Sequence, residues 1–160
     1  HLAGQSCEMD KIKRLSIKYG FNIIEDASHA FGGKFKNSLI GSCKYSDITV
    51  FSFHPVKTIT TGEGGVAVTN NQILAKKMIT FREHGIVRNP KDFVGKSHGN
   101  WFYQQQNLGY NYRLSDIHAA LGLSQIKRVN QFIKKRNLIA KYYKNELKKL
   151  FIIFQKKKFN

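Results

Sequence analysis

The sequence predicts an α/β fold in which a mostly parallel sheet is flanked by helices and the chain ends in a long helix. A helical segment over 9–19 ends at Gly20 and leads into an apolar strand over 21–24, which acidic residues follow. A strand over 47–53 rich in β-branched residues and a helical segment over 72–82 repeat this alternation. Alternating helices and strands are typical of a parallel sheet covered by helices.

The first predicted helix has Ile12, Leu15 and Tyr19 at helical spacing. Gly20 is well suited to end it, because glycine adopts the left-handed conformation that closes many helices. The strand over 21–24 is apolar and is therefore predicted to be buried.

Further elements follow along the chain. The strand over 47–53 is rich in β-branched and aromatic residues. Residues 62–65, Gly-Glu-Gly-Gly, predict a tight turn, and a third strand is expected over 66–69 before Asn70 and Asn71. Residues 72–82 again have helical spacing.

The second half of the chain is predicted to be a long loop followed by helix. Residues 85–108 have no clear period and contain an aromatic run at 101–103, so we expect a loop. Ser115 is a plausible helix N-cap, and apolar residues keep helical spacing from there to about Leu150, with a bend expected at Gly122.

Composition excludes several classes of protein. The chain of 160 residues with 41% hydrophobic residues is long and apolar enough for a globular core. It has no apolar run of about 18 residues, so no membrane span is expected. The first residues do not resemble a signal peptide. Cys7 and Cys43 fit no metal-binding spacing, and a reducing, cytoplasmic location is expected.

The net charge of +17 has two interpretations. It indicates a nucleic-acid or anionic-membrane partner, or it reflects solvated, lysine-rich helix faces. Lysine outnumbers arginine and the excess lies from Lys127 onward, which favours the solvated faces, because base-reading interfaces prefer arginine. A basic nucleic-acid-binding module stays as an alternative function.

Lys57 is the first candidate for chemistry. It follows the strand over 47–53, and ligands of open α/β sheets bind beyond the carboxyl ends of strands. A desolvated lysine amine loses proton affinity and becomes a nucleophile for carbonyl carbon. By position alone, an ordinary solvated lysine is the more common interpretation.

Asp26 and Ser52, two polar residues near strand ends, are further candidates for the same site as Lys57. Asp26 follows the first strand, where a carboxylate can pair with the protonated ring nitrogen of pyridoxal phosphate. Asp26 can equally be the N-cap of a helix. The Ser52 hydroxyl can bind a phosphate, or it is an ordinary strand serine.

Three motifs together resemble those of the DegT/DnrJ-type nucleotide-sugar aminotransferases. They are EDASHAFG at 25–32, SFHPVK at 52–57 followed by GEGG at 62–65, and GYNYRLSDIHAALG at 109–122. The motifs occur in the family's order and cover nearly the whole chain. The resemblance implies the aspartate-aminotransferase-like large domain of fold type I, with pyridoxal 5′-phosphate as the cofactor and no metal.

The resemblance also implies roles for single residues. Lys57 would hold the cofactor through its amine and act as base and acid. Asp26 would pair with the ring nitrogen, His29 would lie near the ring's phenolic oxygen, and Ser52 would bind the cofactor phosphate. Asn111 would reach the cofactor phosphate of a neighbouring subunit, so that a homodimer shares its active sites.

The implied reaction moves an amino group from an amino acid, usually glutamate, to a keto sugar. Residues 53–61 and 101–109 are most similar to the branch that aminates C4 of a UDP-linked 4-keto-6-deoxy-N-acetylhexosamine, a step toward pseudaminic acid in surface or flagellar glycans. The aromatic run would stack on sugar or uracil, or would anchor its loop. Related sugar dehydratases carry histidine in place of the lysine, so Lys57 favours amino transfer and a dehydratase is the alternative.

The family has longer chains, which sets an expectation for domain organisation. Residues 1–150 are expected to form an incomplete cofactor-binding large domain without its N-terminal part. Residues 151–160 would begin the connection to a C-terminal small domain. A chain truncated in this way is expected to be inactive by itself and to aggregate through exposed sheet edges.

Overall fold

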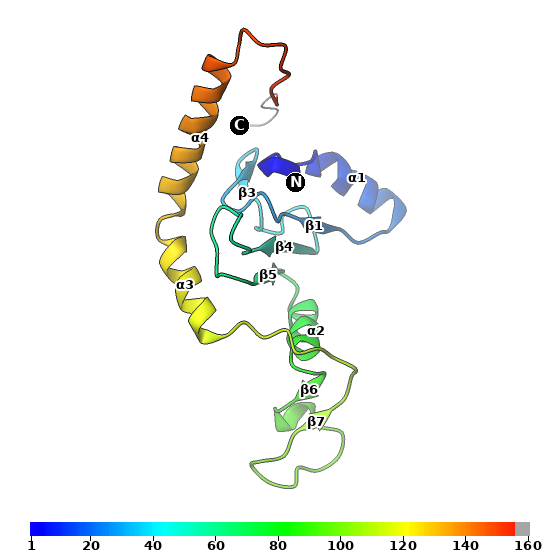
Figure 1. Cartoon of the computed structure of the whole chain (residues 1–160). Coiled ribbons are helices and arrows are strands. Elements are labelled where there is room, and N and C mark those ends of the chain that lie inside the picture. Colours follow the sequence, from blue (N-terminus) through cyan, green and yellow to red (C-terminus); the bar gives the residue numbers. More distant parts are fainter. Residues whose placement is uncertain (156–160) are drawn as a thin grey trace. The chain divides into compact units, whose positions relative to one another are not determined.

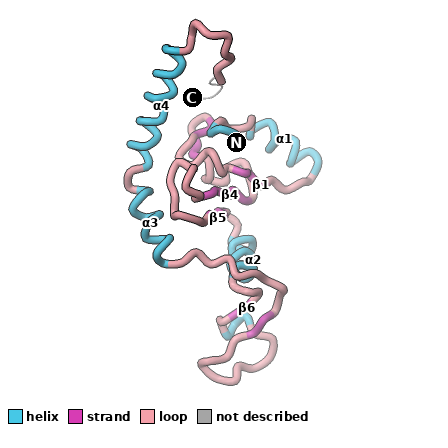
Figure 2. Tube along the Cα trace, in the orientation of Figure 1, coloured by secondary structure: helices cyan, strands magenta, loops and turns pink. Residues whose placement is uncertain are grey.

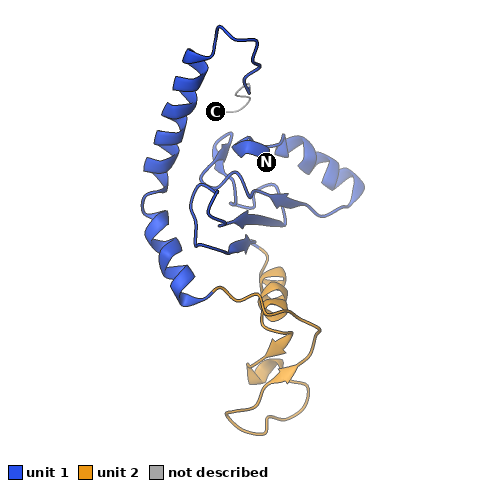
Figure 3. Ribbon diagram, in the orientation of Figure 1, with its two compact units in different colours: residues 1–70, 115–160 blue, residues 71–114 orange. Residues whose placement is uncertain are grey.

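A computed structural model describes residues 1–155 of the chain. Two compact units form, the first from residues 1–70 and 115–160 and the second from residues 71–114 (Figure 3). Of the expected connection over 151–160, residues 156–160 lie outside the described part.

The chain forms both helices and strands, as the sequence predicts, but five strands follow one another between α1 and α2 (Figures 1 and 2). In chain order they are η1 (Leu2–Gly4), α1 (Met9–Tyr19), β1 (Ile24–Asp26), β2 (Lys34–Phe35), β3 (Ser38–Leu39), β4 (Ile48–Ser52), β5 (Gly65–Val68), α2 (Gln72–Arg82), β6 (Ile86–Val87), η2 (Pro90–Asp92), β7 (Gln104–Gln105), α3 (Asp116–Ile126) and α4 (Val129–Glu146).

The sheet of the first unit has the strand order β1-β4-β5. β1 runs parallel to β4, with Asp26 beside Val50, and β5 runs antiparallel to β4. The predicted strand over 21–24 is shifted, because β1 begins at Ile24, and Ile23 before it donates its backbone N–H to the Asp47 carboxylate at 2.7 Å. The parallel pair places the ends of β1 and β4 at one edge of the sheet.

The main core lies beside this edge. Its buried members come from the segments that follow β1 and from the β4 region, namely Ala27, Ala30, Ile40, Phe51, Phe53 and Ile59. Phe31 packs edge to face on Phe51 and Phe53, with ring centroids 5.1 and 5.5 Å away. Val129 and Phe132 of α4 pack against the same cluster, so α4 covers the core where the site is expected.

The helix boundaries follow from their caps. α1 ends at Gly20, whose φ of 71° is left-handed, and α2 begins after Asn71, whose side chain accepts hydrogen bonds from the backbone N–H groups of Ile73 and Leu74. Ser115 caps α3 by accepting from the backbone N–H of His118. The predicted helices over 9–19 and 72–82 and the predicted cap at Ser115 are confirmed.

The expected single helix from 115 to about 150 is instead two helices. α3 ends at Ile126 and α4 begins at Val129, so the break lies at residues 127–128 and the bend expected at Gly122 is wrong. Gly122 is buried inside α3, and a Cβ atom there would lie 2.8 Å from Cγ2 of Thr61. Glycine at this position allows the helix to approach the Thr61 segment closely.

In the second unit, residues 85–108 contain two short strands, although the sequence predicted only a loop there. β6 and β7 pair antiparallel inside this range. Phe102 packs edge to face on Phe93 with centroids 5.2 Å apart, whereas Trp101 is 73% exposed. Arg88 lies 5.2 Å from the centre of the Tyr103 ring. Phe102 therefore anchors the segment within its own unit, and Trp101 is presented to solvent.

Among the helices of residues 1–155, none combines the length and the apolar character that crossing a bilayer requires.

Candidate active site

The parallel pairing of β1 and β4 builds the candidate site. The Ala27 N–H donates to the Val50 carbonyl at 2.9 Å, which extends the pairing just past Asp26. β4 ends at Ser52, and the chain then makes a closed loop in which the Thr61 N–H donates to the Phe53 carbonyl at 3.0 Å. Lys57 lies within this loop, at the same edge of the sheet as Asp26.

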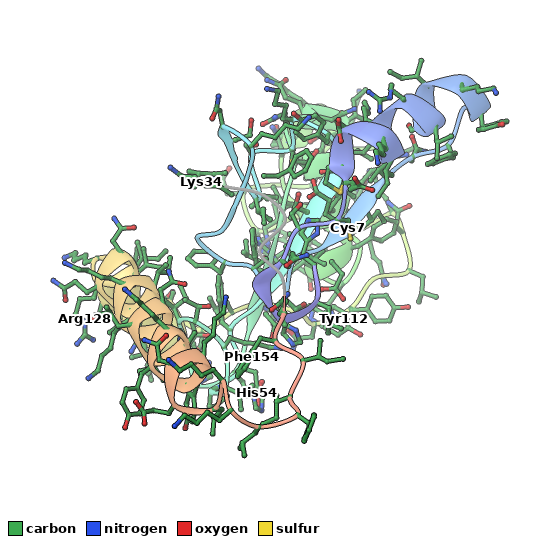
Figure 4. The ribbon with its side chains drawn as sticks, turned by 90° about the horizontal axis from the view of Figure 1, so that it is seen from above. Cys7, Lys34, His54, Tyr112, Arg128 and Phe154 are labelled. Carbon is green, nitrogen blue, oxygen red and sulfur yellow. The ribbon has the colours of Figure 1, made fainter. Side chains whose placement is uncertain are left out.

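The backbone of Lys57 is held from two sides. Its N–H donates to the His54 carbonyl at 3.0 Å, and its carbonyl accepts from Nη2 of Arg136 on α4 at 3.1 Å. A cavity of about 660 Å³ lies between this loop and α4, lined among others by Lys57, Ile59, Phe132, Arg136, Ile139 and Tyr143. Figure 4 shows the side chains along α4, with Arg128 labelled beside its first turn. α4 therefore fixes the main chain from which the Lys57 amine extends.

Asp26 ends β1 with an exposed carboxylate. Its Oδ1 accepts the backbone N–H of Ser28 at 3.0 Å. Hydrogen bonds from Ser28 lower the pKa of the Asp26 carboxyl below its ordinary 3.8, and the positive charges of His29 and Lys57 lower this pKa further. The carboxylate is therefore ionised at neutral pH and lies within electrostatic range of Lys57.

The alternative interpretation of Asp26 as a helix N-cap is wrong. The residues after Asp26 form turns and no helix before β2. The bond from the Ser28 N–H to the Asp26 carboxylate is a local turn of the kind that aspartate often makes.

His29 and Ser52 lie in the same unit as Asp26 and Lys57. His29 is exposed, and its Nδ1 accepts the backbone N–H of Ala3 at 3.2 Å, so the neutral ring carries its proton on Nε2. Ser52 is half-buried at the end of β4, and its Oγ accepts the N–H of His54 at 3.4 Å. The His54 side chain is exposed and accepts the Val56 N–H through Nδ1.

Asn111 belongs to the second unit. There its backbone forms an isolated antiparallel bridge with Glu83, and the residue is exposed. The structure thus groups four of the five predicted site residues within the first unit, and Asn111 lies in the other unit.

Sequence reasoning missed a buried polar network behind Asp26. Glu25, 7% exposed, accepts Nε2–H of His1 at 2.6 Å through Oε2. Its Oε1 accepts the hydroxyl of Ser46 in a short hydrogen bond and that of Thr49 at 3.3 Å. One signal was available, since a carboxylate next to an apolar strand has to find partners when it is buried. Nothing in the sequence pointed to His1.

The charges of this pair shift each other's pKa. The hydrogen bond to Glu25 raises the pKa of His1 above its ordinary 6.5. Burial acts to raise the pKa of Glu25, but the hydrogen bonds from His1 and Ser46 outweigh it and leave this pKa below 4.5. The folded protein therefore favours the ionised pair.

Stability should depend on pH through this pair. The contribution of Glu25 is complete above 4.5 and is lost as the pH falls through its lowered folded pKa. The contribution of His1 is complete below 6.5 and is lost as the pH rises through its raised folded pKa. In the full-length gene product, the urea concentration at the unfolding midpoint should fall at both low and high pH. We expect Glu25→Gln to make both decreases smaller. If the midpoints of the two proteins change with pH by the same amount, the His1–Glu25 pair is not the cause of the pH dependence.

The grouping has a clear chemical capacity. Four groups lie along one sheet edge. They are the Asp26 carboxylate and His29 imidazole at and after the end of β1, and the Ser52 hydroxyl and Lys57 amine at and after the end of β4. Such a set suits a ligand that combines a protonated aromatic nitrogen, a phosphate and an aldehyde. Within residues 1–155, no three His, Cys, Asp or Glu side chains gather as metal ligands.

Comparisons with known proteins relate this chain to aminotransferases. The DegT/DnrJ/EryC1/StrS aminotransferase family matches residues 1–158. The UDP-4-amino-4,6-dideoxy-N-acetyl-beta-L-altrosamine transaminase of Campylobacter jejuni is 44% identical over 147 residues, which is 92% of this chain and 36% of that protein.

Solved structures agree with this. PseC of Helicobacter pylori, an aminotransferase involved in the biosynthesis of pseudoaminic acid, superimposes with a TM-score of 0.81 at 37% identity, over 92% of this chain and 37% of that one. A Streptococcus pneumoniae protein in a PMP-form superimposes with a TM-score of 0.76 at 27% identity, over 91% and 41% of the two chains. The chain thus spans little more than a third of the length of the curated relative described above.

Proposed function

Because the chain belongs to the DegT/DnrJ/EryC1/StrS aminotransferase family, we propose that it carries the cofactor lysine of a pyridoxal-phosphate-dependent sugar aminotransferase. One observation supports this most directly. β1 and β4 run parallel, so Asp26 at the end of β1 and the segment after β4 that carries Lys57 lie at the same edge of the sheet. In the proposed site, Asp26 pairs with the ring nitrogen, Ser52 binds the phosphate and His29 lies near the phenolic oxygen.

The residues perform the reaction as follows. The bound cofactor supplies an electron sink that stabilises negative charge at the donor's α-carbon. Asp26, ionised at neutral pH, holds the ring nitrogen protonated through its negative charge. Lys57 would hold the cofactor through Nζ, and this nitrogen would serve as the base that takes the proton from the donor's α-carbon and as the acid that delivers one to the sugar's C4. The half-buried Ser52 fixes the phosphate end of the ring.

For the substrate, we propose glutamate as donor and a UDP-linked 4-keto-6-deoxy-N-acetylhexosamine as acceptor. Support comes from residues 53–61 and 101–109, which resemble the pseudaminic-acid branch, and from the names of the Campylobacter and Helicobacter relatives. Trp101, 73% exposed, is available to stack on uracil or sugar. A lysine at position 57 supports amino transfer over dehydration.

The proposal extends to assembly and context. Residues 1–150 would form part of a cofactor-binding large domain, and residues 151–160 would lead toward a small domain. Asn111 would reach the cofactor phosphate of a second subunit, so that the active sites belong to a homodimer. The free thiols of Cys7 and Cys43 suit a reducing cytoplasm.

One assay of the full-length gene product tests the function. We expect a visible absorbance band from the bound cofactor, and glutamate-dependent amination of the UDP-linked 4-keto sugar, followed as 2-oxoglutarate release and by mass spectrometry of the sugar. The same sugar linked to GDP serves as the control for the nucleotide. If the purified protein binds no cofactor and aminates neither sugar, the proposal is wrong.

A further inference from the structure

The geometry points to His1 and Glu25 as a positioning pair, which holds the Asp26 carboxylate and the His29 imidazole in place for the cofactor. The inference rests on the proposed function and deepens it. Neither residue belongs to the groups that would touch the cofactor. Both act through their neighbours in the chain.

Glu25 lies on the opposite face of β1 from Asp26, because successive side chains of a strand alternate. On that face its partner in the register is Thr49, which is fully buried. Hydroxyl groups of Ser46 and Thr49 and the ring of His1 all donate to the Glu25 carboxylate. A carboxylate with three donors at fixed positions restrains the strand that carries it, and Asp26 is the next residue on that strand.

His1 closes the network from outside the sheet. Its side chain is 2% exposed, and its Nδ1 accepts the backbone N–H of Cys7 at 3.1 Å. In the neutral ring the proton therefore sits on Nε2, where it is donated to Glu25. Cys7, labelled in Figure 4, ends the segment 1–7 that this ring ties to β1.

The same segment reaches the candidate site directly. Ala3, two residues after His1, donates its backbone N–H to Nδ1 of His29 at 3.2 Å. This bond leaves Nε2 of His29 as the donor toward the site. Anchoring of His1 by Glu25 thus fixes two groups at once, Asp26 through β1 and His29 through Ala3. Small displacements of such groups lower rates strongly.

The test compares His1→Ala with the unmutated full-length gene product. We expect its cofactor affinity, measured by equilibrium dialysis, and its kcat each to fall roughly 10- to 100-fold, as is typical when a supporting residue is lost. The KM for the sugar should stay unchanged. The pH midpoint of the cofactor's visible band should shift, because the Asp26 charge no longer sits in its place. His1→Gln, which restores a donor, should recover part of each loss.

Glu8→Gln is the matched control, because Glu8 is an exposed carboxylate next to the same segment and forms an ion pair with Lys11 on the surface. If His1→Ala lowers the melting temperature but leaves cofactor affinity, band midpoint and kcat at the control values, the pair is merely structural and the inference is overturned. Should His1→Ala not fold, Ser46→Ala decides the matter, with the same changes expected at smaller size. Absence of a cofactor band in the unmutated protein overturns the proposed function instead, and the inference with it.

Discussion

Lys57→Ala should abolish amino transfer by the full-length gene product and remove the cofactor's visible band. The substitution deletes a primary amine at this edge that can both bond to an aldehyde and carry a proton. General acid–base catalysis alone contributes about 10²- to 10⁴-fold, and covalent attachment adds to it, so we expect a loss of at least roughly 10³-fold in kcat. Stopped assays of 2-oxoglutarate release and an absorbance spectrum measure the two effects.

The control for this substitution is Lys44→Ala. Lys44 is exposed before β4, with its Nζ lying 5.5 Å from the centre of the Tyr45 ring, and it lies away from the predicted site residues in sequence. It should keep both the band and the rate. A visible band that survives Lys57→Ala at full intensity would show that another amine holds the cofactor.

Asp26→Asn should have the second-largest effect. Asparagine retains an oxygen that can accept the Ser28 N–H, so the turn after β1 and the melting temperature should be preserved. The negative charge that is proposed to face the ring nitrogen is lost, however. Removal of a preorganised electrostatic group costs about 10²- to 10³-fold in kcat, and we expect a loss of this size in steady-state assays.

Asp47→Asn provides a matched comparison. The Asp47 carboxylate also accepts a backbone N–H, that of Ile23 at 2.7 Å, but it precedes β4 and so lies at the opposite edge of the sheet from Asp26. It should leave kcat unchanged. Equal kcat values for Asp26→Asn and the unmutated protein would remove Asp26 from the site.

The ends of α1 and α2 were predictable because residues next to each end in the sequence determine where the helix stops or starts. Gly20 supplies the left-handed residue that closes α1, and Asn71 supplies the side chain that caps α2. The break at 127–128 was not predictable, since the apolar spacing continues across it. Gly122 was predicted to bend the helix, but it instead allows α3 to approach Thr61 closely. Only the tertiary fold reveals that contact.

Among the strands and the site residues, too, some features were predictable from the sequence and others were not. The parallel pairing of β1 and β4 gives Asp26 and Lys57 a shared edge, as the predicted parallel sheet implied, although β2 and β3 rather than a helix lie between the two strands. The pairing of β6 with β7 joins residues far apart in sequence that have no strand-like pattern, so it escaped prediction. The same holds for His1, whose partner Glu25 is brought to it only by folding. The roles of the five site residues stay predictions until the substitutions are measured.

The hydrogen bond from Arg136 to the carbonyl of Lys57 has a dynamic consequence. The bond immobilises the root of the side chain and leaves the amine at its tip without that restraint. A lysine has a flexible four-carbon stem, so its tip sweeps an arc whose centre is set by α4. If Lys57 carries the proton as proposed, its amine moves about a backbone position that α4 fixes, while the length of the stem sets how far it reaches.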